Sequence, residues 1–433
     1  MAVFNYGWVV ALSGFFMHLC LGTLYCWGAL TPYITSYLRK FDPTLQYSDT
    51  IIVFMLTPAA QAMAMPVSGM IEKKIGPRIT ALIGGVIFAA GVAFSAYATT
   101  IRQLLITYAF TFGVGMGIVY MNPITCGMKW LPDRKGVISG IVVAGFGLGG
   151  AFFNVLGAYI CNPENKQPDP FFDEDVADRV PLMFMVLGAA YFVMITLSAL
   201  LLRDPTEEEL QLLHASESKS QDLEERTPIK PKPHPSLSKD VDLAGFLCDG
   251  RGYLLWAMMT ATTMAGILVI GTYKTYGNQH GFTDRTLTII GSITLVVNGA
   301  GRLFYGALAD TIGFKMSMVA CFSLQALMVL FFVPSTISPI LYCLVVCGTI
   351  ANYGANFPLY PTATAEIFGT KYVGQNYGVV FSGFAAAGIL LKLGLSAGFL
   401  SYETLILLTS FGSGIGAIGA YSLTSPWWDK KEI

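Results

Sequence analysis

The chain has 433 residues, of which 54% are hydrophobic and only 12% are charged. An ordinary soluble domain has about 25% charged residues, so this composition argues strongly against a soluble enzyme. The formal net charge is −1, from 26 Lys and Arg against 27 Asp and Glu, and it gives no indication of a nucleic-acid partner.

Long uncharged stretches alternate with short charged turns along the chain. A helix needs about 20 apolar residues to cross the hydrocarbon core of a lipid bilayer, and most of these stretches are long enough. The pattern predicts an all-α membrane protein with twelve transmembrane helices, at residues 7–34, 48–71, 79–99, 103–127, 137–160, 180–202, 252–273, 285–308, 316–333, 339–362, 372–397 and 403–424.

The most polar segment, residues 203–251, holds 18 of the 53 charged side chains and is rich in Glu, Lys, Ser and Pro. This composition predicts a largely disordered linker. The start of the linker, residues 204–213, is compatible with a short extension of the sixth helix. The linker separates an N-terminal six-helix bundle, residues 1–202, from a C-terminal six-helix bundle, residues 252–433.

Lys and Arg are unevenly distributed between the two predicted membrane faces. The face that includes both termini and the 203–251 linker carries 17 of them, and the other face carries 7. Because cytosolic loops of membrane proteins have an excess of Lys and Arg, we expect the termini and the linker in the cytosol. This holds for a plasma membrane and for an organelle membrane.

Two loop motifs recur at a nearly constant offset, which indicates an internal duplication. Residues 69–78 match 306–315 with an offset of 237, and residues 136–140 match 374–378 with an offset of 238. Parallel six-helix repeats are the plan of many secondary transporters, with the site between the two halves. We interpret the loops as gates, or alternatively as helix turns whose charges only set the topology. The predicted gating residues are Gly69, Glu72, Lys73, Arg78, Asp310, Gly313 and Lys315.

Four segments carry a family resemblance: LCLGTLYCWG at 19–28, KWLPDRKG at 129–136 followed by GIVVAGFGLGG at 140–150, NGAGRLFYGALAD at 298–310 and FGTKYVGQNYG at 368–378. Together they resemble the oxalate/formate antiporter branch of the major facilitator superfamily, which is related to the monocarboxylate transporters. The resemblance implies two pseudo-symmetric six-helix bundles, acting as a monomer without a cofactor. It also implies alternating-access transport of a small organic anion, either a monocarboxylate such as pyruvate, lactate or formate, or an oxalate-like dicarboxylate.

Arg302 is the first candidate for binding the anion, because a charged side chain inside the membrane is expensive and marks a candidate functional site. Asn298 and Tyr305 share its helix face, and its guanidinium group is able to form two parallel hydrogen bonds with a carboxylate. In the family that the chain resembles, the matching arginine binds the substrate carboxylate. The structural alternative is an arginine that reaches the cytosolic interface.

Lys392 in the eleventh span and Lys274 at the end of the seventh are the other candidate cations. Oxalate-type members of the family tend to carry their eleventh-helix lysine soon after the Asn-Tyr-Gly motif, about 12 Å from Lys392 along the helix. The role of the family's eleventh-helix lysine therefore carries over to Lys392 only in part. Both lysines have an alternative role at the outer interface.

Other side chains are expected to complete the site. His18 is the only histidine in an apolar span, and it is either the proton-coupling residue or a neutral packing residue. Tyr353, Asn356 and Tyr360 form one stripe of the tenth span. The resemblance places pocket aromatic residues on the first, fourth and tenth spans. The neutral candidates are Tyr25, Trp27, Tyr120, Asn298, Tyr353, Asn356 and Tyr360, whose alternative role is packing between helices.

The coupling mode and the substrate class leave alternatives open. Proton-coupled monocarboxylate transporters carry an aspartate where this chain has Asn298, so the resemblance favours exchange with a counter-anion, or uniport, over symport with a proton. The competing functions are transport of a sugar or amino acid, and a receptor of the same fold that does not transport. A membrane enzyme is not expected, because the four histidines show no metal-ligand spacing and no nucleophile–base cluster.

Overall fold

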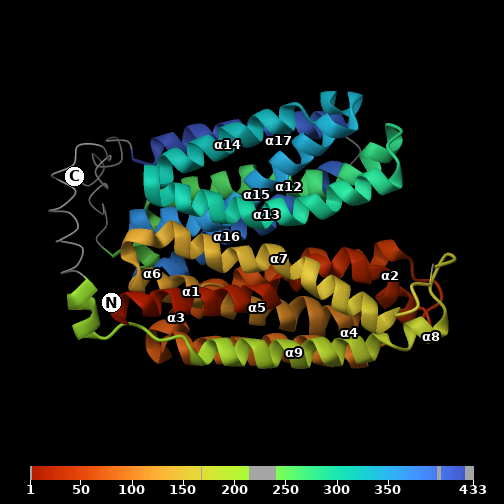
Figure 1. The fold of residues 1–433 in the computed structure, drawn as a ribbon, viewed down its shortest axis with the longest axis horizontal. Helices are drawn as coiled ribbons and strands as arrows, with labels where there is room; N and C mark the ends of the chain where they lie inside the picture. The colour runs from red at the N-terminus through yellow and green to blue at the C-terminus, as the bar shows by residue number, and fades with distance from the viewer. Residues whose placement is uncertain (1, 167, 214–239, 397–400, 425–433) are drawn as a thin grey trace.

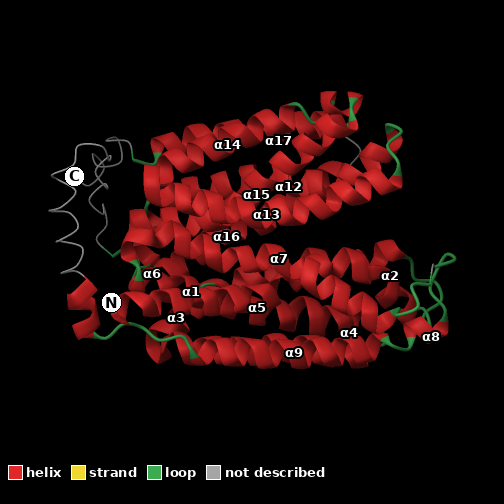
Figure 2. Cartoon of the chain, viewed as in Figure 1, coloured by secondary structure: helices red, strands yellow, loops and turns green. Residues whose placement is uncertain are grey.

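The structure is a computed structural model that describes residues 2–166, 168–213, 240–396 and 401–424. Within these ranges every regular element is a helix and none is a strand (Figure 2). Large apolar side chains point outwards from the helices, and Met63, Val155 and Ile418 are each at least 70% exposed. An apolar surface of this extent is suited to lipid, in which only structures with internally paired backbones are stable.

The N-terminal bundle ends at residue 200 (Figure 1). Its fourth span is interrupted at Met121, just before Pro123, because proline has no N–H group for the helical hydrogen bond. The main elements are α1 (Ala2–Leu21), η1 (Gly22–Cys26), α2 (Trp27–Leu38), α3 (Tyr47–Phe94), α4 (Ile101–Leu104), the π-helical η3 (Leu105–Phe112), α5 (Gly113–Tyr120), α6 (Asn122–Trp130), η4 (Pro132–Arg134), α7 (Lys135–Cys161), α8 (Glu174–Ala177) and α9 (Val180–Leu200).

The C-terminal bundle packs beside it with α13 next to α7 (Figure 1). The helix α16 contacts α3. Its elements are α11 (Leu243–Cys248), α12 (Gly250–Gln279), α13 (Asp284–Ile312), α14 (Phe314–Leu330), η5 (Pro334–Ile337), α15 (Pro339–Phe368), α16 (Val373–Ser396) and α17 (Tyr402–Ser422).

The described residues form 10 helical stretches that are long and apolar enough to cross a membrane. One of them contains α3, which is bent at Gly76 and therefore crosses twice, and the shorter apolar helix α14 adds another crossing. The prediction of twelve transmembrane helices in two bundles is thus confirmed. The seventh, eighth and tenth helices run further than predicted, to residues 279, 312 and 368.

The duplicated loop motif has the same backbone geometry in both halves. Gly76 has φ 81° and ψ 167°, and Gly313, 237 residues later, has φ 85° and ψ 153°. A side chain strongly disfavours these positive φ values, so glycine lets each chain reverse directly from one span into the next. We call the membrane face at Gly76, Pro132–Arg134, Gly313 and Gly369 the basic face.

The two bundles touch closely along the half of the membrane next to the basic face. A Cβ atom added at Gly306 of α13 would lie 2.3 Å from the carbonyl oxygen of Gly136, and one added at Gly69 of α3 would lie 2.6 Å from the backbone nitrogen of Gln375. Only glycine allows backbones to approach this closely. Towards the opposite face α7 and α13 diverge (Figure 1).

Most of the predicted disordered linker, residues 214–239, lies outside the described residues. At its start, α9 ends at Leu200 and a separate helix covers 207–213, because Pro205 disfavours helix at the residue before it. Arg203 donates two hydrogen bonds to Glu209 and so lowers the pKa of that carboxyl to about 2. The carbonyl of Arg203 accepts a hydrogen bond from Trp130, and at the far end the Val241 N–H bonds to the carbonyl of Phe368, so both described ends of the linker contact the bundles.

Candidate functional site

Arg302 lies on α13 at the contact with α7 and is completely buried. Its Nη1 donates to the carbonyl oxygen of Val143 in the other bundle at 2.8 Å, and its Nε donates to Oδ1 of Asn298 at 3.1 Å. Its Nη2 has no hydrogen-bond partner. The guanidinium group is therefore held in a fixed orientation between the bundles with one nitrogen left unsatisfied.

The glycines of α7 make room for this arginine. A Cβ atom added at Gly147 would lie 2.9 Å from Oδ1 of Asn298 and 3.4 Å from Nε of Arg302. A carbonyl oxygen has two lone pairs, so the Val143 carbonyl is able to accept a hydrogen bond within its own helix and a second one from Arg302. The glycine-rich stretch of α7 thus accommodates the buried charge of Arg302 and also allows the helices to pack closely.

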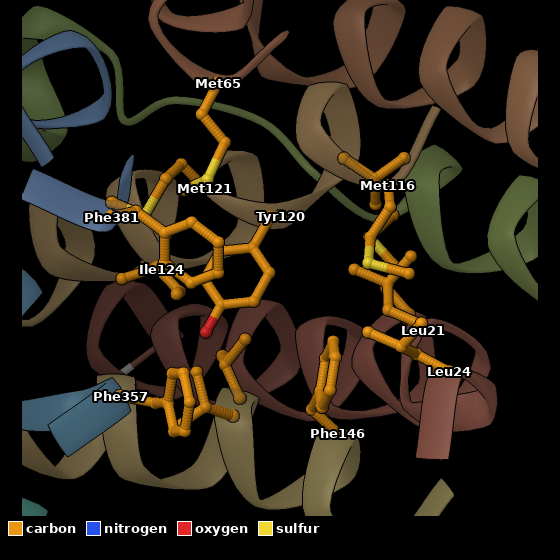
Figure 3. Close-up of a cluster of buried hydrophobic side chains, with 14 of the residues drawn as sticks. Leu21, Leu24, Met65, Met116, Tyr120, Met121, Ile124, Phe146, Phe357 and Phe381 are labelled. Atoms are coloured by element: carbon orange, nitrogen blue, oxygen red, sulfur yellow. The ribbon is translucent and has the colours of Figure 1, made fainter. Parts of the chain in front are cut away.

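Aromatic rings surround the guanidinium group. Its central carbon lies 4.7 Å from the ring centre of Phe357 and 5.6 Å from that of Phe146. Tyr120, Tyr377 and Phe381 continue this wall, with the Tyr120 ring 5.5 Å from Phe381 and 6.5 Å from Tyr377. Figure 3 shows the Tyr120 hydroxyl pointing between Phe357 and Phe146. We call these five residues the aromatic cage.

His18 adjoins the aromatic cage from α1. Its ring lies 4.7 Å from that of Tyr120 and 6.4 Å from that of Phe146, and it is completely buried. His18 Nε2 and the hydroxyls of Tyr120 and Tyr377 have no hydrogen-bond partner, like Nη2 of Arg302. The four groups that carry these unsatisfied atoms all belong to the aromatic cage or lie against its rings. Buried polar atoms are normally hydrogen-bonded, which marks these groups as candidates for contact with a polar ligand.

Two further candidates from the sequence adjoin this place. The half-buried Tyr25 packs edge-on against Phe146, with ring centres 5.3 Å apart, and Tyr353 packs edge-on against Phe357 at 5.4 Å. Asn298 touches Arg302 directly, as described above. The structure thus brings together Arg302, Asn298, His18, Tyr120, Tyr25 and Tyr353.

Three candidates lie elsewhere within the bundles. Trp27 donates to the carbonyl of Thr50 at 3.2 Å and packs on Tyr108 inside the N-terminal bundle. Asn356 and Tyr360 lie 2.7 and 3.1 Å from the hydroxyl of Thr262 on α12, inside the C-terminal bundle. In this conformation, none of the described hydrogen bonds of these three residues reaches Arg302.

The two candidate lysines lie away from Arg302. Lys392 is exposed on α16, at i+11 from Phe381 and i+4 from Gly388, so the three share one helix face. That face leads from the aromatic cage towards the face of the membrane opposite the basic face. Lys274 is exposed on α12, with its Nζ 3.4 Å from the hydroxyl of Thr288.

The predicted gating residues meet at the basic face, and three of them cross between the bundles. Asp310 accepts hydrogen bonds from the N–H groups of Gly136 and Val137, both at 2.7 Å, and so caps the positive N-terminal end of α7. Lys73, which matches Asp310 at the offset of 237, lies 3.7 Å above the ring of Tyr372. Gly69 makes the close approach to α16 described above.

The other predicted gating residues act within one bundle. Glu72 accepts a hydrogen bond from Thr125 at 2.8 Å and lies 3.7 Å from Nζ of Lys129. Arg78 donates to the carbonyl of Leu202, and Lys315 lies 4.1 Å from the ring centre of Tyr421. Gly313 forms the turn. Glu72 stands one position before Lys73, and a one-residue shift turns a side chain by about 100° on a helix, which points Glu72 into its own bundle.

Four residues of the aromatic cage were not predicted from the sequence. Phe146, Phe357 and Phe381 resemble ordinary packing residues, and only their contacts with Arg302 or Tyr120 distinguish them. Tyr377 belongs to the motif at 374–378, whose match with 136–140 indicates a duplication, and this motif is the one sequence signal that points to Tyr377.

A family model described as Major Facilitator Superfamily matches residues 10–392 of the chain. The chain is 27% identical to the apicoplast pyruvate carrier 1 of Toxoplasma gondii, over 88% of this chain and 82% of that protein. It is 26% identical to the oxalate:formate antiporter of Oxalobacter formigenes, over 95% and 90% respectively. The solved structure of the Escherichia coli fucose:proton symporter matches with a TM-score of 0.64 at 12% identity, over 95% of this chain and 98% of that chain. The chain is a multi-pass membrane transporter that belongs to the Major Facilitator Superfamily.

Proposed function

We propose that the protein transports small organic carboxylates by alternating access, with Arg302 binding the carboxylate. The observation that carries this proposal is the completely buried guanidinium group with an unpartnered Nη2, held between the two bundles. An unsatisfied buried polar group costs about 1–3 kcal/mol, and more when it is charged. A carboxylate supplies the acceptor that Nη2 lacks and neutralises the charge.

The substrate class follows from the charge and the walls of the site. A sugar has no charge to balance Arg302. An amino acid has a carboxylate but also an ammonium group, for which the described partners of Arg302 include no carboxylate. A monocarboxylate balances the charge of Arg302 without adding another. The names of the two relatives, a pyruvate carrier and an oxalate:formate antiporter, support small carboxylates. We favour monocarboxylates such as pyruvate, lactate or formate, followed by an oxalate-like dicarboxylate.

The uncompensated charge also bears on coupling. Asn298 bonds to Arg302 but cannot neutralise it, so the empty site carries a net positive charge in apolar surroundings. Reorienting the empty site is then costly, and reorienting it with a bound anion is cheaper. This favours exchange of one carboxylate for another, with His18 as the site of any proton.

The route of the anion leads from the side where the bundles diverge. Lys392 and Lys274 are exposed towards that side and attract anions electrostatically, so they act before the anion reaches Arg302. The contacts at the basic face close the other end in this conformation. In line with the excess of Lys and Arg there, we assign the basic face to the cytosol.

Uptake into proteoliposomes tests the proposal. The purified protein is reconstituted and offered labelled pyruvate, lactate, formate, oxalate and a hexose, with and without a pH gradient and with or without carboxylate loaded inside. We expect carboxylate uptake that internal carboxylate stimulates and the pH gradient does not drive. Uptake of the hexose alone would contradict the proposal, and binding without any flux would make the protein a receptor.

Disrupting the ion pair between Lys135 and Glu366 at the predicted gate is expected to have a smaller effect on uptake. Nζ of Lys135 lies 2.8 Å from Oε1 of Glu366 across the bundle interface at the basic face. A partly exposed pair of this kind contributes up to about 1 kcal/mol, so Glu366→Gln should change uptake by no more than about fivefold. The reversed pair Lys135→Glu with Glu366→Lys should restore it.

Uptake rates of the single and double variants measure this effect. Lys40→Gln is the control, because Lys40 pairs with Asp178 inside the N-terminal bundle at the opposite face. An unrescued loss in the double variant would show that one side chain acts separately from the pair.

A further inference from the structure

His18 has a defined hydrogen-bonding polarity. Its Nδ1 lies 3.2 Å from the carbonyl oxygen of Gly14, and a carbonyl oxygen only accepts hydrogen bonds. Nδ1 therefore carries the proton of the neutral ring, and Nε2 presents a lone pair. Nε2 is buried, has no partner, and adjoins the aromatic cage. The site thus holds one proton acceptor beside its one fixed positive charge.

The surroundings of His18 determine when this acceptor takes up a proton. The titratable or charged groups that face it are the phenol of Tyr120 on α5 and the guanidinium of Arg302 on α13, while α7 presents the uncharged Phe146. On the other neighbouring helices, Lys129 of α6 is paired with Asp204, and the Tyr191 hydroxyl of α9 contacts Thr23. A second positive charge beside Arg302 is therefore unfavourable unless a ligand brings more than one negative charge.

We propose that His18 is a conditional second cation, which takes up one proton when a dicarboxylate dianion occupies the site and stays neutral when a monocarboxylate does. A monoanion balances Arg302 alone. A dianion leaves one negative charge over, and Nε2 is the group placed to neutralise it by accepting a proton from solvent. His18 belongs to the N-terminal bundle and Arg302 to the C-terminal bundle, so a dianion would be held by one charge from each.

This inference rests on the proposed function and adds a rule to it, that the charge of the substrate sets the number of protons bound with it. Binding of the proton and of the dianion must then strengthen each other by the same factor. The affinity for oxalate should fall by up to about tenfold for each pH unit above the point at which His18 in the complex loses its proton. The affinity for pyruvate should show no such dependence.

Titration calorimetry of the purified protein tests the rule without any variant. Oxalate and pyruvate are titrated between about pH 6 and 8, where both ligands are fully ionised, in buffers that differ in ionisation enthalpy. We expect oxalate binding to take up about one proton on the acidic side of this range and pyruvate binding to take up none. Oxalate binding without proton uptake, equal uptake with pyruvate, or no oxalate binding near pH 6 would each overturn the inference.

A pair of variants assigns the proton to its residue. His18→Gln keeps a polar side chain that cannot titrate, so the proton uptake and the pH dependence of oxalate affinity should disappear. The matched control is His280→Gln, because His280 bonds to the carbonyl of Tyr276 on α12, away from the site. A pH dependence that persists in His18→Gln would move the proton to another group. If neither ligand binds to the wild-type protein at any pH, the proposed function itself fails.

Discussion

Arg302→Ala is expected to reduce carboxylate uptake by about 100-fold or more while leaving the protein folded. The unpartnered Nη2 carries two N–H groups, and each hydrogen bond that it donates to a carboxylate contributes about 1.5–3 kcal/mol, so alanine removes both. Arg302→Lys keeps the charge, but a single ammonium nitrogen lacks the planar set of donors with which the guanidinium group bonds to the Val143 carbonyl and to a carboxylate at the same time. We therefore expect a loss of at least about tenfold for lysine as well.

Stability separates a binding role of Arg302 from a structural one. In the wild-type protein its charge is buried with only neutral partners, so replacing it with alanine should not lower the melting temperature. Pyruvate should raise the melting temperature of the wild-type protein and not that of Arg302→Ala, because a ligand stabilises only a protein that binds it.

The matched control is Arg102→Ala, which removes an exposed arginine at the start of α4 and should leave uptake unchanged. Normal uptake by a well-folded Arg302→Ala protein would contradict the assignment. A parallel loss of uptake and of stability would instead make Arg302 a structural residue that joins the bundles.

The sequence predicted the twelve helices because the bilayer imposes a length and an apolar composition on every span. It also singled out Arg302, since a charge is costly in the middle of an apolar span. Both predictions depend on the membrane and not on contacts between particular side chains. The ends of the helices were less predictable, as the continuation of the seventh helix to residue 279 shows.

The neighbours of each side chain were harder to predict. Tyr353, Asn356 and Tyr360 share one stripe of α15, yet Tyr353 meets Phe357 beside Arg302 while Asn356 and Tyr360 bond to Thr262. The helix is enclosed by several others, so its period cannot tell which neighbour a stripe faces. The phenylalanines of the aromatic cage were missed for a related reason, because a phenylalanine in a membrane helix carries no sign of what it touches.

Gly306→Val is expected to reduce transport by at least about tenfold by preventing closure at the basic face. A Cβ atom at this position would lie 2.3 Å from the carbonyl oxygen of Gly136 and 3.0 Å from Cα of Gly140. These are backbone atoms that cannot rotate away, so the bundles must separate there. Alternating access requires the protein to close at each end in turn, and a carrier that cannot close at one end cannot complete its cycle.

Spin labels on the two bundles measure the separation directly. Lys74→Cys and Thr311→Cys place the labels at exposed positions of α3 and α13 beside the basic face. The distance between them should increase in Gly306→Val relative to the wild-type background. Gly414→Val serves as the control, because a Cβ atom there meets nothing within 4 Å. If Gly306→Val loses transport at an unchanged label distance, closure does not depend on this glycine contact, and the valine acts instead through Arg302, one helical turn away on the same helix.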